Sequence, residues 1–348
     1  MTKPRLEWLL LFIPVSLALS LWHQELAVFF TSALAILPLA ALIGRSTEQL
    51  AIRAGPRAGG LLNATFGNIT ELIISVLLIL RNEIQIVKAS LTGSILGNLL
   101  LVLGMSLFVG GLRHDRQRFN SQTASVHTSS MILAVAGFLM PALFVLSSGQ
   151  DTLLEREVVS GVVAAILILL YAAVLLFTFV THQHLFQVPR SDEEPTWSVR
   201  WSIGVLLVST ALVALESELL VRSLEPALED LGLSRLFVGL ILVPIIGNAA
   251  EHSSAVMFAL RDQVDVTIEI TTGSSLQIAL FVAPALVFIS LIAGHPMDFV
   301  FTPFEVGAVA MSAILVAVIS RDGESNWLEG AQLMATYAII AISFFFVS

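Results

Sequence analysis

The chain has 348 residues, of which 56% are hydrophobic and 12% charged, with a formal net charge of −9 and a mean hydropathy of +0.90. A soluble domain carries roughly twice that charged fraction, so the composition indicates an integral membrane protein. The lack of cysteine excludes disulfides, thiolate metal sites and cysteine nucleophiles, and no basic patch indicates nucleic-acid binding.

Apolar segments of about 18 to 25 residues follow one another along the chain, which predicts helices rather than barrel strands. Lys3 and Arg5 precede the first segment as in a signal peptide, but no small-residue cleavage site follows, so we interpret it as a helix. We expect an all-α integral membrane protein with about 11 transmembrane helices. The expected spans are 7–22, 26–44, 58–80, 88–111, 129–148, 157–180, 200–221, 235–260, 266–293, 299–319 and 329–347.

A polar linker divides the chain near its middle and holds the acidic run Asp192, Glu193 and Glu194. These acids are interpreted either as part of a solvated loop or as a cation-sensing element. The expected parts are an N-terminal transmembrane helix over 1–24, a five-helix repeat over 25–181, a cytoplasmic linker over 182–199 and a second five-helix repeat over 200–348.

Basic residues predict the orientation, because cytoplasmic loops of membrane proteins are enriched in Lys and Arg. With the expected spans, 12 of the 17 Lys and Arg residues fall on the side of the N-terminus and 5 on the other. We therefore expect a multi-pass protein with a cytoplasmic N-terminus and a C-terminus on the opposite side.

One motif occurs twice, at an offset of 180 residues: Gly67-Asn68-Ile69-Thr70-Glu71 and Gly247-Asn248-Ala249-Ala250-Glu251. The offset also pairs Arg81 with Arg261 and the cluster 92–94 with 272–274. Each copy places an acid inside an apolar segment, where an ionised carboxylate costs several kcal/mol unless it is compensated. The duplication favours a functional site over a structural carboxylate that a neighbouring helix satisfies.

Glu71 and Glu251 are the predicted metal-binding and proton-carrying residues. Asn68 and Asn248 each precede the acid by three positions, so we expect each amide oxygen to lie on the same helix face as that acid. Oxygen ligands alone suit Ca²⁺ or a similar hard cation. Pro244 is expected to free a backbone carbonyl just before the second motif.

A second polar cluster follows each acid by about 23 to 27 residues. Ser94 and Asn98 lie in the first half, and Ser274 and Gln277 lie in the second. We predict that these four side chains support the acids. The alternative for the serines is close packing of small residues, which is common in membrane helices.

Further polar residues are assigned lesser roles. Glu48, Glu216 and Glu218 are candidate pathway residues for a cation, or interfacial acids without a function. His252 is assigned to the supporting network, as a proton relay or as a hydrogen-bonding partner within the bundle.

Five helices in each repeat is an odd number, so the two halves enter the membrane from opposite sides. Such an inverted repeat places the substrate site near the midplane between the halves. Glu71 and Glu251 would then face each other across a pseudo-two-fold axis.

These motifs resemble the Ca²⁺/H⁺ antiporter family, the cation/proton exchanger branch of the Ca²⁺/cation antiporters. The resemblance is carried by residues 61–73, 93–98, 247–252, 273–277 and 321–330. It implies that Glu71 and Glu251 carry the exchanged cation and the protons, surrounded by a polar network of Asn68, Asn248, Ser94, Asn98, Ser274 and Gln277. The linker departs from the family, because its acidic run is short compared with the acidic segment of some members.

The expected function is exchange of Ca²⁺ for H⁺ by alternating access, in which the two acids bind Ca²⁺ or protons in competition. The alternatives are a Na⁺-driven Ca²⁺ exchanger, a monovalent cation exchanger and a cation channel. No His-Glu-x-x-His or nucleophile–base pattern occurs, so we do not expect an enzyme. The expected partners are the lipid bilayer, Ca²⁺ as substrate and H⁺ as counter-ion, with no cofactor.

Overall fold

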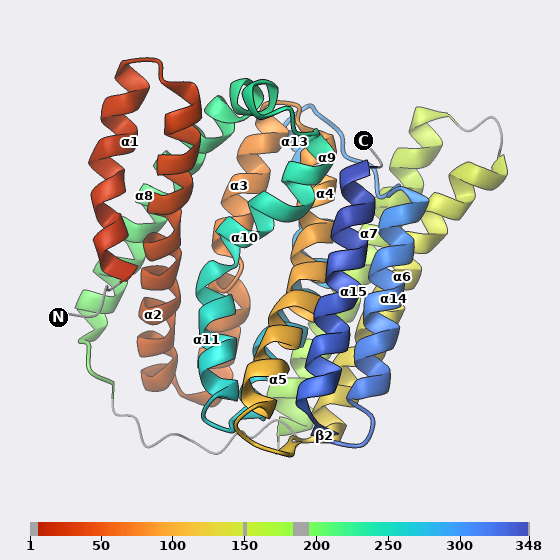
Figure 1. Ribbon diagram of the computed structural model, residues 1–348. Helices are drawn as coiled ribbons and strands as arrows, with labels where there is room; N and C mark the ends of the chain where they lie inside the picture. The colour runs from red at the N-terminus through yellow and green to blue at the C-terminus, as the bar shows by residue number, and fades with distance from the viewer. Residues whose placement is uncertain (1–5, 149–151, 184–194, 347–348) are drawn as a thin grey trace.

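The computed structural model describes residues 6–148, 152–183 and 195–346, and this part of the chain is almost entirely helical (Figure 1). Its only strands are the two-residue segments β1 (Gln117–Arg118) and β2 (Glu324–Ser325), which pair antiparallel with Gln117 opposite Ser325. This pairing joins a loop of the first half to a loop of the second.

The helical elements fall into two successive series. The first series is η1 (Leu6–Leu11), α1 (Phe12–Leu21), α2 (Glu25–Phe66), α3 (Ile69–Leu80), α4 (Ile84–Leu96), η2 (Gly97–Val102), α5 (Leu103–Gly111), α6 (Ser121–Ser148), α7 (Leu153–Leu176) and η3 (Phe177–Thr181). The second is α8 (Val199–Leu231), α9 (Arg235–Phe237), η5 (Val238–Leu242), α10 (Val243–Gly247), α11 (Ala249–Ala259), α12 (Val264–Gln277), η6 (Ile278–Val282), α13 (Ala283–Ile292), α14 (Pro303–Ile319) and α15 (Trp327–Phe346).

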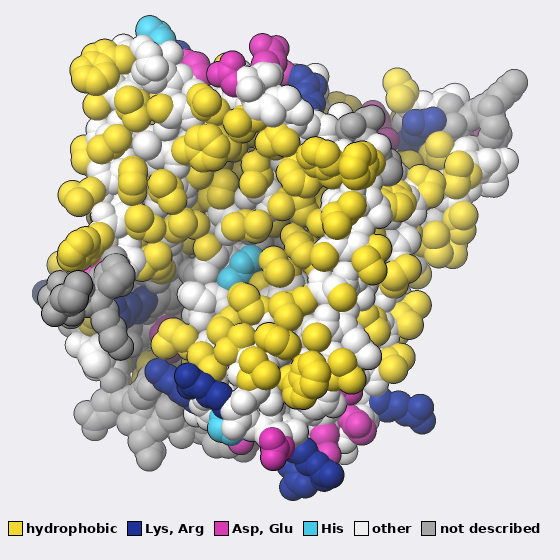
Figure 2. Space-filling model, in the orientation of Figure 1, with side chains coloured by type: hydrophobic (Ala, Val, Ile, Leu, Met, Phe, Trp, Pro, Cys, Tyr) yellow, Lys and Arg dark blue, Asp and Glu magenta, His cyan; other side chains and the backbone are white. Residues whose placement is uncertain are grey.

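Seven helices in the described residues are long and apolar enough to cross a membrane, and an eighth span results if the bent pair Arg235–Gly247 and Glu251–Ala259 is counted as one. Three shorter apolar helices accompany them, at Leu6–Leu21, Ile69–Leu80 and Pro303–Ile319. Figure 2 shows apolar side chains across the middle of the visible face, with charged side chains concentrated at its upper and lower ends. Such a belt matches the hydrocarbon layer of a bilayer.

Two of the expected spans are broken rather than continuous. Residues 58–80 divide at Asn68, whose φ and ψ are −103° and 25°, and residues 235–260 divide at Asn248, with −95° and 6°. The second break bends the chain by 65°. Element α2 consists of two helices that meet at a kink at Gly55, whose φ is +83°, so the second expected span lies in its first part, Glu25–Gly55. Only a residue without a Cβ adopts that conformation readily.

The 180-residue offset of the sequence recurs in the helix boundaries. Helices α3 and α11 begin at Ile69 and Ala249, and α4 and α12 begin at Ile84 and Val264. A stretch of π-helix follows both α4 and α12, as η2 and η6. Such π-helical stretches are rare and occur mostly at functional sites.

The buried apolar residues form two separate clusters. A small cluster of Leu39, Ile43, Leu206 and Val213 joins α2 to α8, and a much larger one includes residues of the other helices and also of α2 and α8. In Figure 1 helices α1, α2 and α8 stand together at one side of the molecule. These three helices form a smaller unit, which is joined to the large core through α2 and α8.

The two halves pack differently around their equivalent glycines. A Cβ on Gly93 of α4 would lie 2.0 Å from the Leu240 carbonyl oxygen of η5, so the two backbones are in close contact there. The equivalent position on Gly273 of α12 has only one atom within 4 Å, the Glu269 Oε1 at 3.9 Å. Gly60, the counterpart of Leu240, lies instead against the ring of Phe179 in η3. The two backbones are therefore in contact where α4 crosses η5, whereas the equivalent face of α12 at Gly273 is unpacked in the described part of the chain.

Replacing Gly93 by alanine should destabilise the protein, because the added methyl group has no room against Leu240. Overpacking of this kind costs about 1–3 kcal/mol of unfolding free energy. We expect the thermal unfolding midpoint of the purified protein in detergent to fall by roughly 2–6 °C.

Gly273→Ala is the matched control, because its methyl group would meet nothing closer than 3.9 Å. Its midpoint should equal or slightly exceed that of the wild type, since alanine is the better helix former by about 1 kcal/mol. An equal loss in both variants would contradict the asymmetric packing.

Candidate cation site

Both motif acids lie at the start of a short helix. Glu71 is in the first turn of α3 and Glu251 in the first turn of α11, and the asparagines of the two motifs occupy the N-cap positions. The prediction that each asparagine and acid share one continuous helix face is therefore wrong, because the helix begins between them. The arrangement places each carboxylate at the positive end of a helix dipole, which stabilises negative charge.

Four buried oxygens at these two helix starts have no hydrogen-bond partner among the described residues. Each copy of the motif contributes an amide and a carboxylate oxygen: Asn68 Oδ1, Glu71 Oε2, Asn248 Oδ1 and Glu251 Oε2. Buried polar atoms of native proteins are nearly always paired, so such orphans indicate either a ligand or a catalytic role. Here all four are acceptors, as the ligands of a cation must be.

The amide nitrogens of the same asparagines are engaged across the two halves. Asn68 Nδ2 donates to Gln277 Oε1 at 2.6 Å, and Asn248 Nδ2 donates to Ser94 Oγ at 3.0 Å. Asn248 Nδ2 also donates to the Pro244 carbonyl oxygen at 3.1 Å. Because each nitrogen is committed to a partner, the oxygen of each amide is the atom that remains for a ligand.

The two acids lie within electrostatic reach of each other. A Cβ on Gly247 would lie 3.0 Å from Glu71 Oε1, so the first acid rests directly against the backbone of the second motif. Glu251 accepts a hydrogen bond from the Ser274 side chain. The structure thus brings together both acids, both asparagines and the predicted supporting residues Ser94, Ser274 and Gln277.

Two more predicted network residues end in unpaired buried nitrogens. Asn98 lies in η2, is 1% exposed, and has no hydrogen-bond partner for Nδ2 among the described residues. His252 Nε2 is likewise buried without a described partner. The Asn98 amide nitrogen is a donor only, and a His252 Nε2 that carries a proton is also a donor, so neither is a cation ligand in that form. Both can donate to a water oxygen at the site.

The donor set consists of oxygens. The described residues contain no cluster of three or more His, Cys, Asp or Glu side chains able to hold a metal. Two carboxylates and two amide oxygens fit a hard divalent cation, which takes six to eight oxygen ligands and accepts carbonyls and water among them.

The three candidate pathway acids are in different environments. Glu48 is exposed, and Glu218 forms an ion pair with Arg81. Glu216 has no exposed surface, and both of its oxygens lie within 3.0 Å of Ser16 Oγ in α1. This contact favours a structural role for Glu216, in which it ties the first helix to α8.

Sequence reasoning missed two titratable residues in apolar helices. Glu305 of α14 is 3% exposed, caps its own helix through Thr302, and lies 3.4 Å from Thr92 Oγ1 of α4. His127 of α6 is 4% exposed and contacts Thr272 of α12. For Glu305 the signal was an ionisable residue within an apolar run, which at membrane depth is a candidate functional residue. His127 lies in the polar stretch 121–130, before the expected span 129–148, so the sequence carried no such signal for it.

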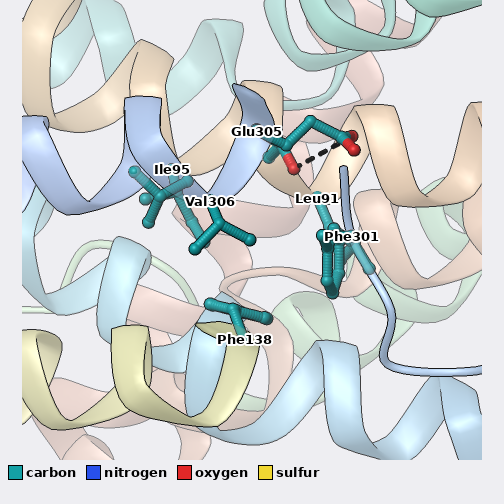
Figure 3. Close-up of a pocket in the computed structure, with 8 residues that line it drawn as sticks. Leu91, Ile95, Phe138, Phe301, Glu305 and Val306 are labelled. Carbon is teal, nitrogen blue, oxygen red and sulfur yellow. Dashed lines mark hydrogen bonds between the residues drawn. The ribbon is translucent and has the colours of Figure 1, made fainter. Parts of the chain in front are cut away.

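Figure 3 shows Glu305 above a small pocket between α4, α6 and α14. Aromatic rings of Phe138 and Phe301 and aliphatic side chains line the rest of it. The pocket is lined in part by Thr92, which precedes Gly93, and neither motif acid lines it.

Lys88, at the start of the expected span 88–111, forms an ion pair with Asp298.

The acidic run of the linker, Asp192 to Glu194, lies outside the described residues, and its sensing role stays a prediction. Of the linker's beginning, His182 is described, and its ring stacks on Phe177 at a centroid distance of 4.0 Å.

Comparison with known proteins agrees with the motifs. The family described as sodium/calcium exchanger protein matches residues 25–180 and 201–346. A protein of Aphanothece halophytica named Ca(2+)/H(+) antiporter is 48% identical over 359 aligned residues, which cover 97% of this chain and 95% of the relative. The Ca(2+)/H(+) antiporter ChaA of Bacillus subtilis (strain 168) is 46% identical, with 96% of each chain covered.

A solved structure described as native YfkE has the same fold. It superposes with a TM-score of 0.86 at 42% sequence identity, and the match covers 98% of this chain and 99% of that one. The apolar helices and this family establish an integral, multi-pass membrane protein of the transporter class. The chain therefore belongs to the sodium/calcium exchanger family and, within it, to the Ca²⁺/H⁺ antiporter branch that its motifs resemble.

Proposed function

We propose that this protein exchanges Ca²⁺ for H⁺ across a membrane, with Glu71 and Glu251 as the groups that bind either ion. The observation that carries the proposal is the set of four unpaired buried oxygens contributed equally by the two motifs. The names of the relatives, which are Ca²⁺/H⁺ antiporters, support the choice of ions.

Competition between the ions follows from the electrostatics of the site. When Ca²⁺ is bound, its charge compensates two carboxylates that are otherwise desolvated. When Ca²⁺ leaves, two like charges would remain side by side at membrane depth, and protonation removes that cost. Each carboxylate thus carries either its share of the cation or a proton, and reorientation of the charged, empty site is unfavourable.

We further propose that residues 25–181 and 200–348 form inverted five-helix repeats, preceded by an N-terminal helix in 1–24 and joined by a cytoplasmic linker over 182–199. The shared helix boundaries at an offset of 180 support the repeat. In alternating access, the helix contact at Gly93 would open while the equivalent contact at Gly273 closes, and the reverse. Tight packing at Gly93 and the unpacked Gly273 are consistent with one such state.

The Lys and Arg distribution favours a cytoplasmic N-terminus and a C-terminus on the opposite side. Helix α12 begins next to the loop that carries Arg261, on the proposed cytoplasmic side. The unpacked half of the molecule would accordingly face the cytoplasm.

The exchange reaction is tested by ⁴⁵Ca²⁺ uptake into proteoliposomes with an imposed pH gradient, beside an equal Na⁺ gradient. We expect uptake that the pH gradient drives and a protonophore abolishes. Uptake driven by Na⁺ alone would assign a Na⁺-dependent exchanger. Uptake indifferent to both gradients would indicate a channel and contradict coupling.

Glu71→Gln and Glu251→Gln should each lower proton-driven uptake by roughly 100-fold or more, since even indirect partners of a metal contribute about 10- to 100-fold to its binding. Glutamine keeps the size of the side chain but carries neither a charge nor an exchangeable proton. The variants should still elute as folded, monodisperse protein.

The control for both variants is Glu229→Gln, an exposed acid at the end of α8 that should retain wild-type uptake. Full transport by either motif variant would show that its acid is not an ion carrier.

A further inference from the structure

His127 is a buried histidine outside the two motifs, and it contacts α12, the helix that carries the hydrogen-bonding partner of Glu251. It lies in α6, is 4% exposed, and its Nδ1 is 3.0 Å from Thr272 Oγ1 of α12. Thr272 directly precedes Gly273, and Ser274, which hydrogen-bonds Glu251, follows. The imidazole is therefore attached to the turn of α12 that contacts one of the motif acids.

The hydrogen bonds of Thr272 determine which imidazole nitrogen carries a proton. Thr272 Oγ1 lies 2.6 Å from the Ile268 carbonyl oxygen, which can only accept, so the hydroxyl proton is donated there. Toward His127 the hydroxyl oxygen is then an acceptor, and His127 Nδ1 must be the donor. In the neutral imidazole Nε2 is consequently the basic nitrogen.

Nε2 faces a second base. Its distance to Glu269 Oε2, one turn earlier on α12, is 3.7 Å, and the Glu269 side chain is 44% exposed. At this distance a protonated imidazole and the carboxylate form an ion pair, so either group can hold the proton. The buried histidine fixes that site in place, while the exposed carboxylate connects it to solvent.

Glu269 also borders the unpacked face of α12. Its Oε1 is the only atom of the described chain within 4 Å of the Cβ position of Gly273. Ser274, the hydrogen-bonding partner of Glu251, is five residues further along the same helix, a rise of about 7.5 Å combined with a rotation of about 140°. Proton transfer between Glu251 and Glu269 therefore has to run through water.

We propose that Glu269, held by His127, is the proton-transfer group between Glu251 and water on the open side of the protein. This inference rests on the proposed Ca²⁺/H⁺ exchange and names a further residue pair for it. The Glu251 carboxylic acid gives its proton, through water, to the Glu269 carboxylate, so that Glu251 becomes the anion that binds Ca²⁺. The Glu269 carboxylic acid then releases the proton to solvent, and His127 Nε2 lies close enough to take it up as a second base.

Other charged groups near the pair have separate contacts. Asp265, one turn before Glu269 on α12, accepts the backbone N–H of Asn120 at 2.6 Å. On α14, Glu305 contacts Thr92 and Thr302. His114, between α5 and β1, lies 3.5 Å from the Leu260 carbonyl oxygen. None of these contacts involves Nε2 of His127 or the Glu269 carboxylate.

Two variants separate proton transfer from structure. In His127→Asn the amide nitrogen takes the place of Nδ1 and keeps the hydrogen bond to Thr272, while the second base is lost. In Glu269→Gln the size is kept and the acid is lost at a half-exposed position, so the fold does not depend on it. Glu229→Gln again serves as the control.

The measurement is the initial rate of proton-driven ⁴⁵Ca²⁺ uptake in proteoliposomes from about pH 5 to pH 8, where histidine titrates. Each rate is measured at a low and at a high concentration of imidazole in the buffer. Both variants should be slower at low buffer by roughly 10- to 100-fold, the lower part of the range for a lost acid–base group. Their pH profile should change, and added imidazole should restore the rate, because a small base replaces the missing relay.

Ca²⁺ binding to the purified variants, measured by calorimetry at one pH, should match the wild type. Weaker Ca²⁺ binding together with a rate that imidazole does not restore would overturn the inference and assign the pair a structural role. Wild-type rates and pH profiles in both variants would overturn it too. If the wild type itself shows no proton-driven uptake, the proposed exchange fails, whereas variant-specific results bear on the pair alone.

Discussion

The cost of burying two carboxylates in one place governs this structure. Glu71 and Glu251 lie within electrostatic reach of each other, and each has an oxygen without a hydrogen-bond partner in the described part of the chain. The chain compensates them partially, by placing each at the positive end of a helix and by one hydrogen bond from Ser274 to Glu251. Full compensation by fixed protein charges would hold the site in one ionisation state. The incomplete compensation leaves room for an exchangeable ion.

The breaks at Asn68 and Asn248 create the two helix N-termini that stabilise the carboxylates of Glu71 and Glu251. Backbone groups that lose their helical partners are tolerated there only where the protein covers them or a polar cavity adjoins them. Asn68 and Asn248 occupy the breaks and tie them to the opposite half through Gln277 and Ser94. Each broken helix is therefore held by the other half of the chain, and a shift of one half would alter the proposed cation ligands of both.

Packing divides the protein in a way that suits such a shift. Helices α2 and α8 share a small apolar cluster, and both also contribute residues to the large core. Glycines permit close contact between α4 and η5 at one crossing, and the corresponding crossing at α12 is unpacked. Well-packed units change by moving relative to one another more readily than by deforming internally. The buried contact between Ser16 and Glu216 makes α1 part of the smaller unit.

The sequence by itself determined the membrane class, the duplication and the identity of the acids, because composition, a 180-residue offset and an acid in an apolar run are local or periodic signals. The family followed from the same motifs. Only the tertiary structure decided that both motif helices break at their asparagines, that Gln277 and Ser94 serve the motif of the other half, and that Glu216 is tied to Ser16. It also decided that His127 meets Thr272 and Glu269. These are contacts between residues up to about 200 positions apart, and helical periodicity carries no information about which distant face packs on which.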